Sequence, residues 1–334
     1  MLHREDAAPL LINSSLRFGG LINNGYLCRV KWIKGHGYLI VTAVFAVAVF
    51  CLWNFKYPHI LCEWEQSSLF IWDSTYVADR LAMPSGWAGL IWAFITQFFF
   101  NTSLGAAIMA VLCVLTLGLA FKLLCMLTKR MTPRLRPVCY LIALIPALYV
   151  CYLPLHPLGG TEEEMEYDYL IRKSDWVGIV KKSSEKSPLS YACNSAAALA
   201  QFETGQMNQQ SLVENVPIAK QVLSGRSAAF IMSDVYMRTG LVSLSQRSAF
   251  EAMESIENFN KSGRSLTRLV ECSLIYGQYE LTRKYCAILE QTLFYRDWAQ
   301  RMKALADHPE QIDSHPTYGS LRKLCEKASD NFFM

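Results

Sequence analysis

The sequence predicts an all-α protein: three membrane spans and one interfacial or re-entrant helix, followed by a tetratricopeptide-like domain of repeated α-helical hairpins. Three observations predict this fold class. Residues 81–121 form a run of forty-one without a charged side chain. Positive charge is in excess only in the apolar half: residues 1–160 hold 12 Lys and Arg against 6 Asp and Glu, and residues 161–334 hold 20 against 22. Glycines in the second half recur at a spacing typical of helical hairpins.

The first span is predicted over residues 37–55, after a cytosolic tail of residues 1–36. These nineteen uncharged residues would make a helix about 28 Å long, enough for a hydrocarbon core of roughly 30 Å. The tail ends in a basic flank, and the positive-inside rule therefore places the N-terminus in the cytosol. The basic residues of this flank are Arg17, Arg29, Lys31 and Lys34.

Two further spans are predicted over residues 104–127 and 138–153, completing a membrane domain of residues 37–154. Residues 86–100 are also apolar, but a crossing there would move the basic loop around Lys129, Arg130 and Arg134 to the outer side. The positive-inside rule rejects that arrangement. We therefore expect residues 86–100 to form an interfacial or re-entrant helix, and three crossings then place the C-terminal half outside.

A linker is predicted at residues 155–160 and a soluble helical domain at residues 161–334. Thr161 followed by Glu164 has the spacing of a capping box at the first helix. Gly205, Gly240 and Gly277 then follow one another at intervals of 35 and 37 residues, close to a tetratricopeptide period. Residues 266–289 are the clearest helix–turn–helix unit. The alternative is an ordinary all-helical domain in which the glycines recur by chance.

Catalytic and ligand-binding signals are weak. Spacings typical of zinc, phosphate-loop or dinucleotide sites are absent from the sequence, so we expect no cofactor and no metal centre. The best candidates are Glu63, Asp73 and Asp79 beside Arg80, because carboxylates at a membrane surface can hold a cation or act as a general base. The alternative is that these residues are merely solvated or interfacial.

The cysteines allow two interpretations. A bridge between Cys272 and Cys286 would require an oxidising compartment and a helical hairpin that brings the two side chains together. Otherwise both are buried thiols that pack as small hydrophobic side chains.

Four segments carry a resemblance: YPHILCEWEQSSLF, ADRLAMPSGWAGLIWAFITQFFFNTSLGAAI, EMEYDYLIRKSDW and LIYGQYELTRKYCAILEQTLFYRDWA. With them the chain resembles a domain-of-unknown-function family of polytopic membrane proteins from Bacteroides-type bacteria. The resemblance implies an envelope location, and the chain is short relative to that family between Tyr152 and the acidic EMEYDY segment. The order of parts more loosely resembles multi-span polyprenyl-dependent glycosyltransferases, which would make Asp73 or Asp79 the catalytic carboxylate.

The leading functional hypothesis is a multi-pass protein of the bacterial inner membrane with a periplasmic helical-repeat domain. Its expected partners are membrane lipid and another envelope protein, bound for assembly of the envelope, and no nucleic acid. The alternative is an enzyme, or its inactive remnant, that acts on a lipid-linked sugar. Whether the chain is an enzyme at all is uncertain from the sequence, and the weight of the observations leans against it.

Overall fold

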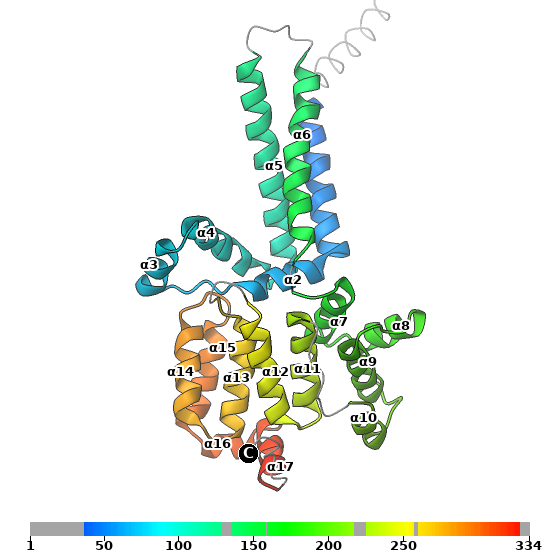
Figure 1. Cartoon of the computed structure of the whole chain (residues 1–334), viewed down its shortest axis with the longest axis vertical. Helices are drawn as coiled ribbons and strands as arrows, with labels where there is room; N and C mark the ends of the chain where they lie inside the picture. Colours follow the sequence, from blue (N-terminus) through cyan, green and yellow to red (C-terminus); the bar gives the residue numbers. More distant parts are fainter. Residues whose placement is uncertain (1–36, 129–134, 158, 217–224, 257–259, 328–334) are drawn as a thin grey trace, which may run out of the picture.

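The computed structural model describes residues 37–128, 135–157, 159–216, 225–256 and 260–327. Over these ranges the chain is helical and contains no strand, which confirms the predicted fold class. The tail that was predicted to be cytosolic, residues 1–36, and most of the basic loop lie outside the described residues. Figure 1 shows a tall bundle of long helices standing on a broader body of shorter helices.

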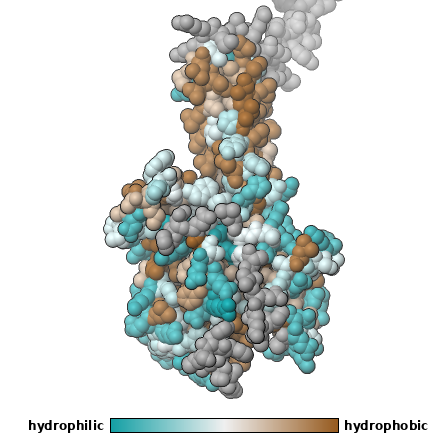
Figure 2. Space-filling view, in the orientation of Figure 1, coloured by the Kyte–Doolittle hydropathy of each residue, from teal (hydrophilic) through white to brown (hydrophobic). Residues whose placement is uncertain are grey.

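Within the described ranges, three helices are long and apolar enough to cross a membrane, as predicted. They are Gly37–Lys56, Thr102–Leu127 (α5) and Arg136–Leu155, the last comprising α6 (Arg136–Tyr152) and η4 (Leu153–Leu155). Small buried residues such as Ala143 and Ala147 let α6 pack closely on α5. Thr42 and Tyr140 share a 2.8 Å hydrogen bond between the first helix and α6. The face of the bundle seen in Figure 2 is mostly apolar.

The ends of the bundle are arranged as three crossings require. The N-terminal end of the first helix lies beside the C-terminal end of α5 and the N-terminal end of α6, and the body of shorter helices lies at the opposite end (Figure 1). The residues predicted to form an interfacial helix fold as α4 (Gly86–Thr96) and η2 (Gln97–Phe100), which are too short to span and lie at the foot of the bundle beside α3 (Ser74–Ala82).

Helix α2 (Pro58–Ser67) lies between the bundle and the body of shorter helices (Figure 1). Every residue from Pro58 to Cys62 is buried, and so are three polar residues on the helix, Glu63, Glu65 and Gln66. The alternative interpretation of Glu63 as a solvated residue is therefore wrong. Helix α2 packs against α5 and η2 on the side of the bundle and against α7 (Glu162–Arg172) on the other side.

The remaining helices form what we call the hairpin domain, in which successive helices pack on one another. After α7 these are α8 (Trp176–Glu185), α9 (Tyr191–Glu203), α10 (Gln209–Asn215), α11 (Arg226–Arg238), α12 (Val242–Glu254), α13 (Gly263–Ile275), α14 (Tyr279–Glu290), α15 (Arg296–Asp307), α16 (Glu310–Ser314) and α17 (Tyr318–Lys327). The predicted capping box of Thr161 and Glu164 begins α7.

The three recurring glycines occupy one structural position. Gly205, Gly240 and Gly277 have φ values of +74°, +84° and +71°, and each follows the first helix of a hairpin. In each case the next amide donates a 2.8 Å hydrogen bond to the carbonyl five residues earlier, which defines the same helix-terminating motif three times. Glycine recurs because this left-handed backbone conformation is strained for other residues.

Ser174 marks a fourth turn of this kind, which the glycine spacing does not reveal. Its φ is +52°, and the amide of Asp175 bonds to the carbonyl of Leu170. The turn joins α7 to α8, so the hairpins are α7–α8, α9–α10, α11–α12 and α13–α14.

We expect Ser174→Gly to stabilise the hairpin domain by about 1 kcal/mol, because it relieves a left-handed conformation at a residue with a Cβ. Gly205→Ala is the reverse change in the same motif, and a Cβ there would meet nothing within 4 Å, so it should cost a similar amount. Thermal unfolding of the full chain measures both. Shifts of the same sign for the two variants would contradict the assignment.

The bridge considered between Cys272 and Cys286 is not formed, and both thiols are free and buried. Burial raises the pKa of each to about 12. They pack in one apolar core with Leu266, Leu274 and Leu289, inside the clearest predicted hairpin. The two cysteines therefore act as small hydrophobic side chains.

Candidate functional site

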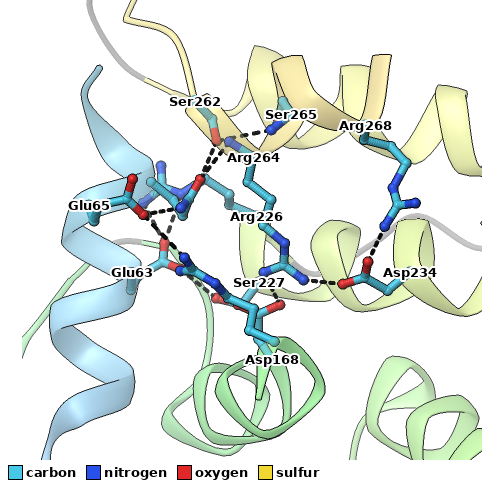
Figure 3. A network of polar contacts seen from close by, with 12 residues as sticks. Glu63, Glu65, Asp168, Arg226, Ser227, Asp234, Ser262, Arg264, Ser265 and Arg268 are labelled. Carbon is cyan, nitrogen blue, oxygen red and sulfur yellow. Dashed lines mark hydrogen bonds and ion pairs between the residues drawn. The ribbon is translucent and has the colours of Figure 1, made fainter. Parts of the chain in front are cut away.

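Glu63 anchors α2 to the hairpin domain. Its side chain is 2% exposed and accepts hydrogen bonds from Arg226 Nε at 2.7 Å and from Ser227 Oγ at 3.0 Å. Both donors lie in the first turn of α11, and the two charged groups also form an ion pair (Figure 3). A buried carboxylate is tolerated when a cation and hydrogen bonds compensate it, as here.

Glu65 and Gln66, two and three residues after Glu63 on α2, make a second connection to the domain. Tyr295 donates a 2.7 Å hydrogen bond to Glu65, and Gln66 Oε1 accepts from Ser262 Oγ at 2.6 Å and from the Arg264 amide at 3.1 Å. Burial raises the pKa of Glu65, and the nearby Arg172 guanidinium opposes that rise. These contacts link α2 to the start of α13 and to α15.

A chain of ion pairs continues from this junction into the hairpin domain (Figure 3). Arg264 pairs with both Asp168 and Asp234, and Arg268 pairs with Asp234 and, at 2.8 Å, with Glu271. Burial raises the pKa of Asp168 to about 6, whereas two guanidinium groups outweigh burial and hold the pKa of Asp234 below its usual range. These ion pairs therefore link helix α13 to helices α7 and α11.

A cavity of about 610 Å³ opens over this chain of ion pairs, and we call it the arginine groove. Its charged lining is five arginines and three carboxylates, and aromatic side chains border it. Two further cavities share residues with it, one of about 540 Å³ toward α17 and one of about 510 Å³ toward the start of α5. The lining includes Phe100, Arg172, Asp234, Arg238, Arg264, Arg268, Glu271, Phe294, Asp297, Trp298 and Arg301.

Two arginines of the groove are available to bind a further anionic group. Arg172 Nη1 is buried without a hydrogen-bond partner among the described residues, while its Nη2 lies 3.5 Å from Glu65. Arg301 is exposed on α15, with no ion pair to any described residue. Guanidinium groups bind carboxylate and phosphate through paired hydrogen bonds, so the groove suits an anionic group.

The structure separates Glu63 from the other three predicted site residues. Asp73, Asp79 and Arg80 line a different cavity of about 320 Å³, together with Lys261. Asp73 begins α3 by accepting hydrogen bonds from the amides of Thr75 and Tyr76, each at 3.0 Å. The Thr75 hydroxyl and those amides hold its pKa below the usual range, so Asp73 is a helix cap and is unsuited to donating a proton.

Sequence reasoning missed the arginine groove. Arg264 and Asp168 are 96 residues apart, and Glu63 and Ser227 are 164 apart, so neither pairing leaves a spacing to recognise. One local signal did exist: Arg264 and Arg268 are four residues apart and would lie on one face of a helix.

The family comparison covers nearly all of the chain. The family described as "Family of unknown function (DUF6057)" matches residues 31–158 and 157–334. The chain belongs to DUF6057. The two matched segments of this DUF6057 member meet next to Gly159, whose carbonyl accepts a 2.9 Å hydrogen bond from the Ser227 amide. No curated protein and no solved structure matches the chain.

Proposed function

We propose that this DUF6057 protein is a multi-pass protein of the bacterial inner membrane that binds an acidic, extended segment of another envelope protein. The arginine groove is the binding surface, and the hairpin domain lies in the periplasm. The observation that carries the proposal is that five arginines and only three carboxylates line the groove, and that Arg172 Nη1 is a hydrogen-bond donor without a partner among the described residues. Carboxylates of a bound peptide would pair with the two available arginines, Arg172 and Arg301.

The shape of the surface favours an extended segment over a compact small molecule. The three cavities share lining residues and run from the residues that precede α5 to α17. Helical-hairpin arrays present long surfaces of this kind to peptides. Aromatic side chains such as Trp298 and Phe294 supply apolar contacts between the charged positions.

The proposed orientation rests on charge. Lys and Arg gather in the N-terminal tail and in the loop between α5 and α6, and α2 and the hairpin domain lie at the other end of the bundle. The positive-inside rule then places the domain outside the cytosol. Reporters active on one side of the membrane, fused after Gly160 and Met334, should report the periplasm, and a fusion after Arg130 should report the cytosol. The reverse pattern would overturn the orientation.

The binding test uses the full chain in lipid nanodiscs and a labelled peptide that alternates Glu with Leu, compared with a peptide in which Gln replaces Glu. We expect salt-sensitive binding of the acidic peptide only. Arg301→Glu should weaken it about tenfold, which corresponds to about 1.4 kcal/mol. Arg296→Glu is the matched control, because Arg296 lies on the same helix and does not line the groove. Equal effects of both variants, or equal binding of both peptides, would refute the proposal.

A lipid-linked-sugar enzyme, or its inactive remnant, is the second candidate, because Asp73, Asp79 and Arg80 line one cavity at the foot of the bundle. Replacing both aspartates by asparagine distinguishes the candidates. Loss of cellular function at normal protein abundance favours the enzyme, whereas unchanged function together with loss in Arg301→Glu favours binding.

A further inference from the structure

His59 of α2 lies against two glutamates of α7. Glu162 and Glu166 are one helical turn apart, and their carboxylate oxygens and the His59 ring nitrogen all lie within 4.8 Å of one another. The distance from His59 Nε2 to Glu162 Oε1 is 3.9 Å, too long for a hydrogen bond. The three groups come from the membrane-side helix and from the first helix of the hairpin domain.

His59 Nε2 has no hydrogen-bond partner among the described residues, although the side chain is only 4% exposed. A buried ring nitrogen without a partner is costly, and most such atoms in proteins are satisfied. Burial lowers the pKa of His59, against the opposing effects of Glu166 and Glu162. A neutral imidazole has the lone pair that a metal ion needs.

We propose that His59, Glu162 and Glu166 bind one Zn²⁺ ion, which clamps α2 to α7. One imidazole nitrogen and two carboxylate oxygens are zinc ligands, and a water molecule would complete a four-coordinate site. Mg²⁺ and Ca²⁺ prefer ligand sets made of oxygen alone, and the histidine therefore favours zinc. The site is separate from the arginine groove, and the inference is independent of the proposed function.

Small side-chain movements suffice to form the site. Ligand atoms at roughly 2.0–2.2 Å from a tetrahedral Zn²⁺ lie about 3.3–3.6 Å apart. Glu162 is 65% exposed and Glu166 is 34% exposed, so both side chains are free to close on an ion that enters from solvent. His59 is the buried, fixed ligand.

Lys182 of α8 competes with the metal. Its ammonium group contacts Glu166 Oε2 and pairs with that carboxylate. Zn²⁺ must displace it, and the 33% exposure of Lys182 gives it room to swing away. Zinc affinity should therefore rise when Lys182 loses its charge, an effect that a merely structural ion pair would not produce.

The test measures Zn²⁺ binding to the full chain in nanodiscs, after removal of metal by a chelator and in competition with a chromophoric zinc indicator. We expect one equivalent to bind, at least tenfold more weakly in His59→Phe and in Glu166→Gln. Lys182→Met should bind several-fold more tightly. Glu163→Gln, which removes a neighbouring charge from the same turn of α7, should bind like the unmodified chain.

Thermal unfolding gives a second readout of the same site. Zn²⁺ should raise the Tm of the unmodified chain and of Lys182→Met, and should leave that of His59→Phe unchanged. Glu166→Gln tests the site independently, because Glu166 is partly exposed and its replacement keeps the side-chain volume. Unchanged zinc affinity in Glu166→Gln, weaker binding in Lys182→Met, or equal binding of Mg²⁺ would overturn the inference.

Discussion

Arg226→Met should lower the free energy of unfolding of the hairpin domain by about 3–5 kcal/mol, because it leaves the Glu63 carboxylate buried without its cation. Glu63 is 2% exposed and Arg226 is 6% exposed, so water cannot replace the missing partner. We expect a lower Tm and faster hydrogen exchange in α2 and in the first turn of α11. Thermal unfolding and exchange mass spectrometry of the full chain in nanodiscs measure the two effects.

Two controls separate the loss of this pair from a general effect of removing charge. Lys181→Met breaks the exposed pair with Glu185 and should cost less than about 1 kcal/mol. Adding Glu63→Gln to Arg226→Met removes the unpaired charge and should recover most of the stability. If the double variant is as unstable as Arg226→Met alone, the buried charge is not the cause.

Gly159→Ala should also be strongly destabilising, by about 2 kcal/mol or more, because its Cβ would overlap the Glu63 carboxylate. The carboxylate cannot retreat, since Arg226 and Ser227 hold it, and the Gly159 carbonyl is fixed by the Ser227 amide at 2.9 Å. We expect the same unfolding and exchange measurements to show a weakened junction between α2 and α11.

Gly118→Ala is the matched control, because a Cβ at Gly118 would meet nothing within 4 Å. It should be neutral or slightly stabilising. Combining Glu63→Ala with Gly159→Ala removes the overlapping group, so the double variant should be no less stable than Glu63→Ala alone. Additive costs would show that Gly159 matters for another reason.

Local patterns in the sequence predicted the parts of the fold that depend on neighbouring residues. Apolar runs predicted the three long apolar helices, Thr161 and Glu164 predicted the start of α7, and Gly205, Gly240 and Gly277 predicted three hairpin turns. Each of these features needs only a few adjacent residues to be recognised. The fourth turn escaped because Ser174 adopts the left-handed conformation without being a glycine.

Contacts between distant segments decide the candidate sites, and the sequence does not display those contacts. In the sequence, Glu63 was grouped with Asp73 and Asp79 as one acidic candidate site because the three lie within seventeen residues. In the structure Glu63 is a buried partner of Arg226, while Asp73 caps α3 at the surface. The charge of Glu63 could be read from the sequence, but its burial depends on residues more than 160 positions away.

Contacts on both faces of α2 fix the orientation of the hairpin domain relative to the three long apolar helices. A domain on a flexible tether samples many heights and angles above a bilayer, and its partners meet it in any orientation. Here the links from Glu63, Glu65 and Gln66 are short and buried, and on the other face Trp64 donates a 2.7 Å hydrogen bond to the Pro154 carbonyl at the end of the third apolar helix. If the three apolar helices tilt to match the thickness of a bilayer, the hairpin domain should turn with them, so that membrane thickness would set the direction in which the arginine groove faces.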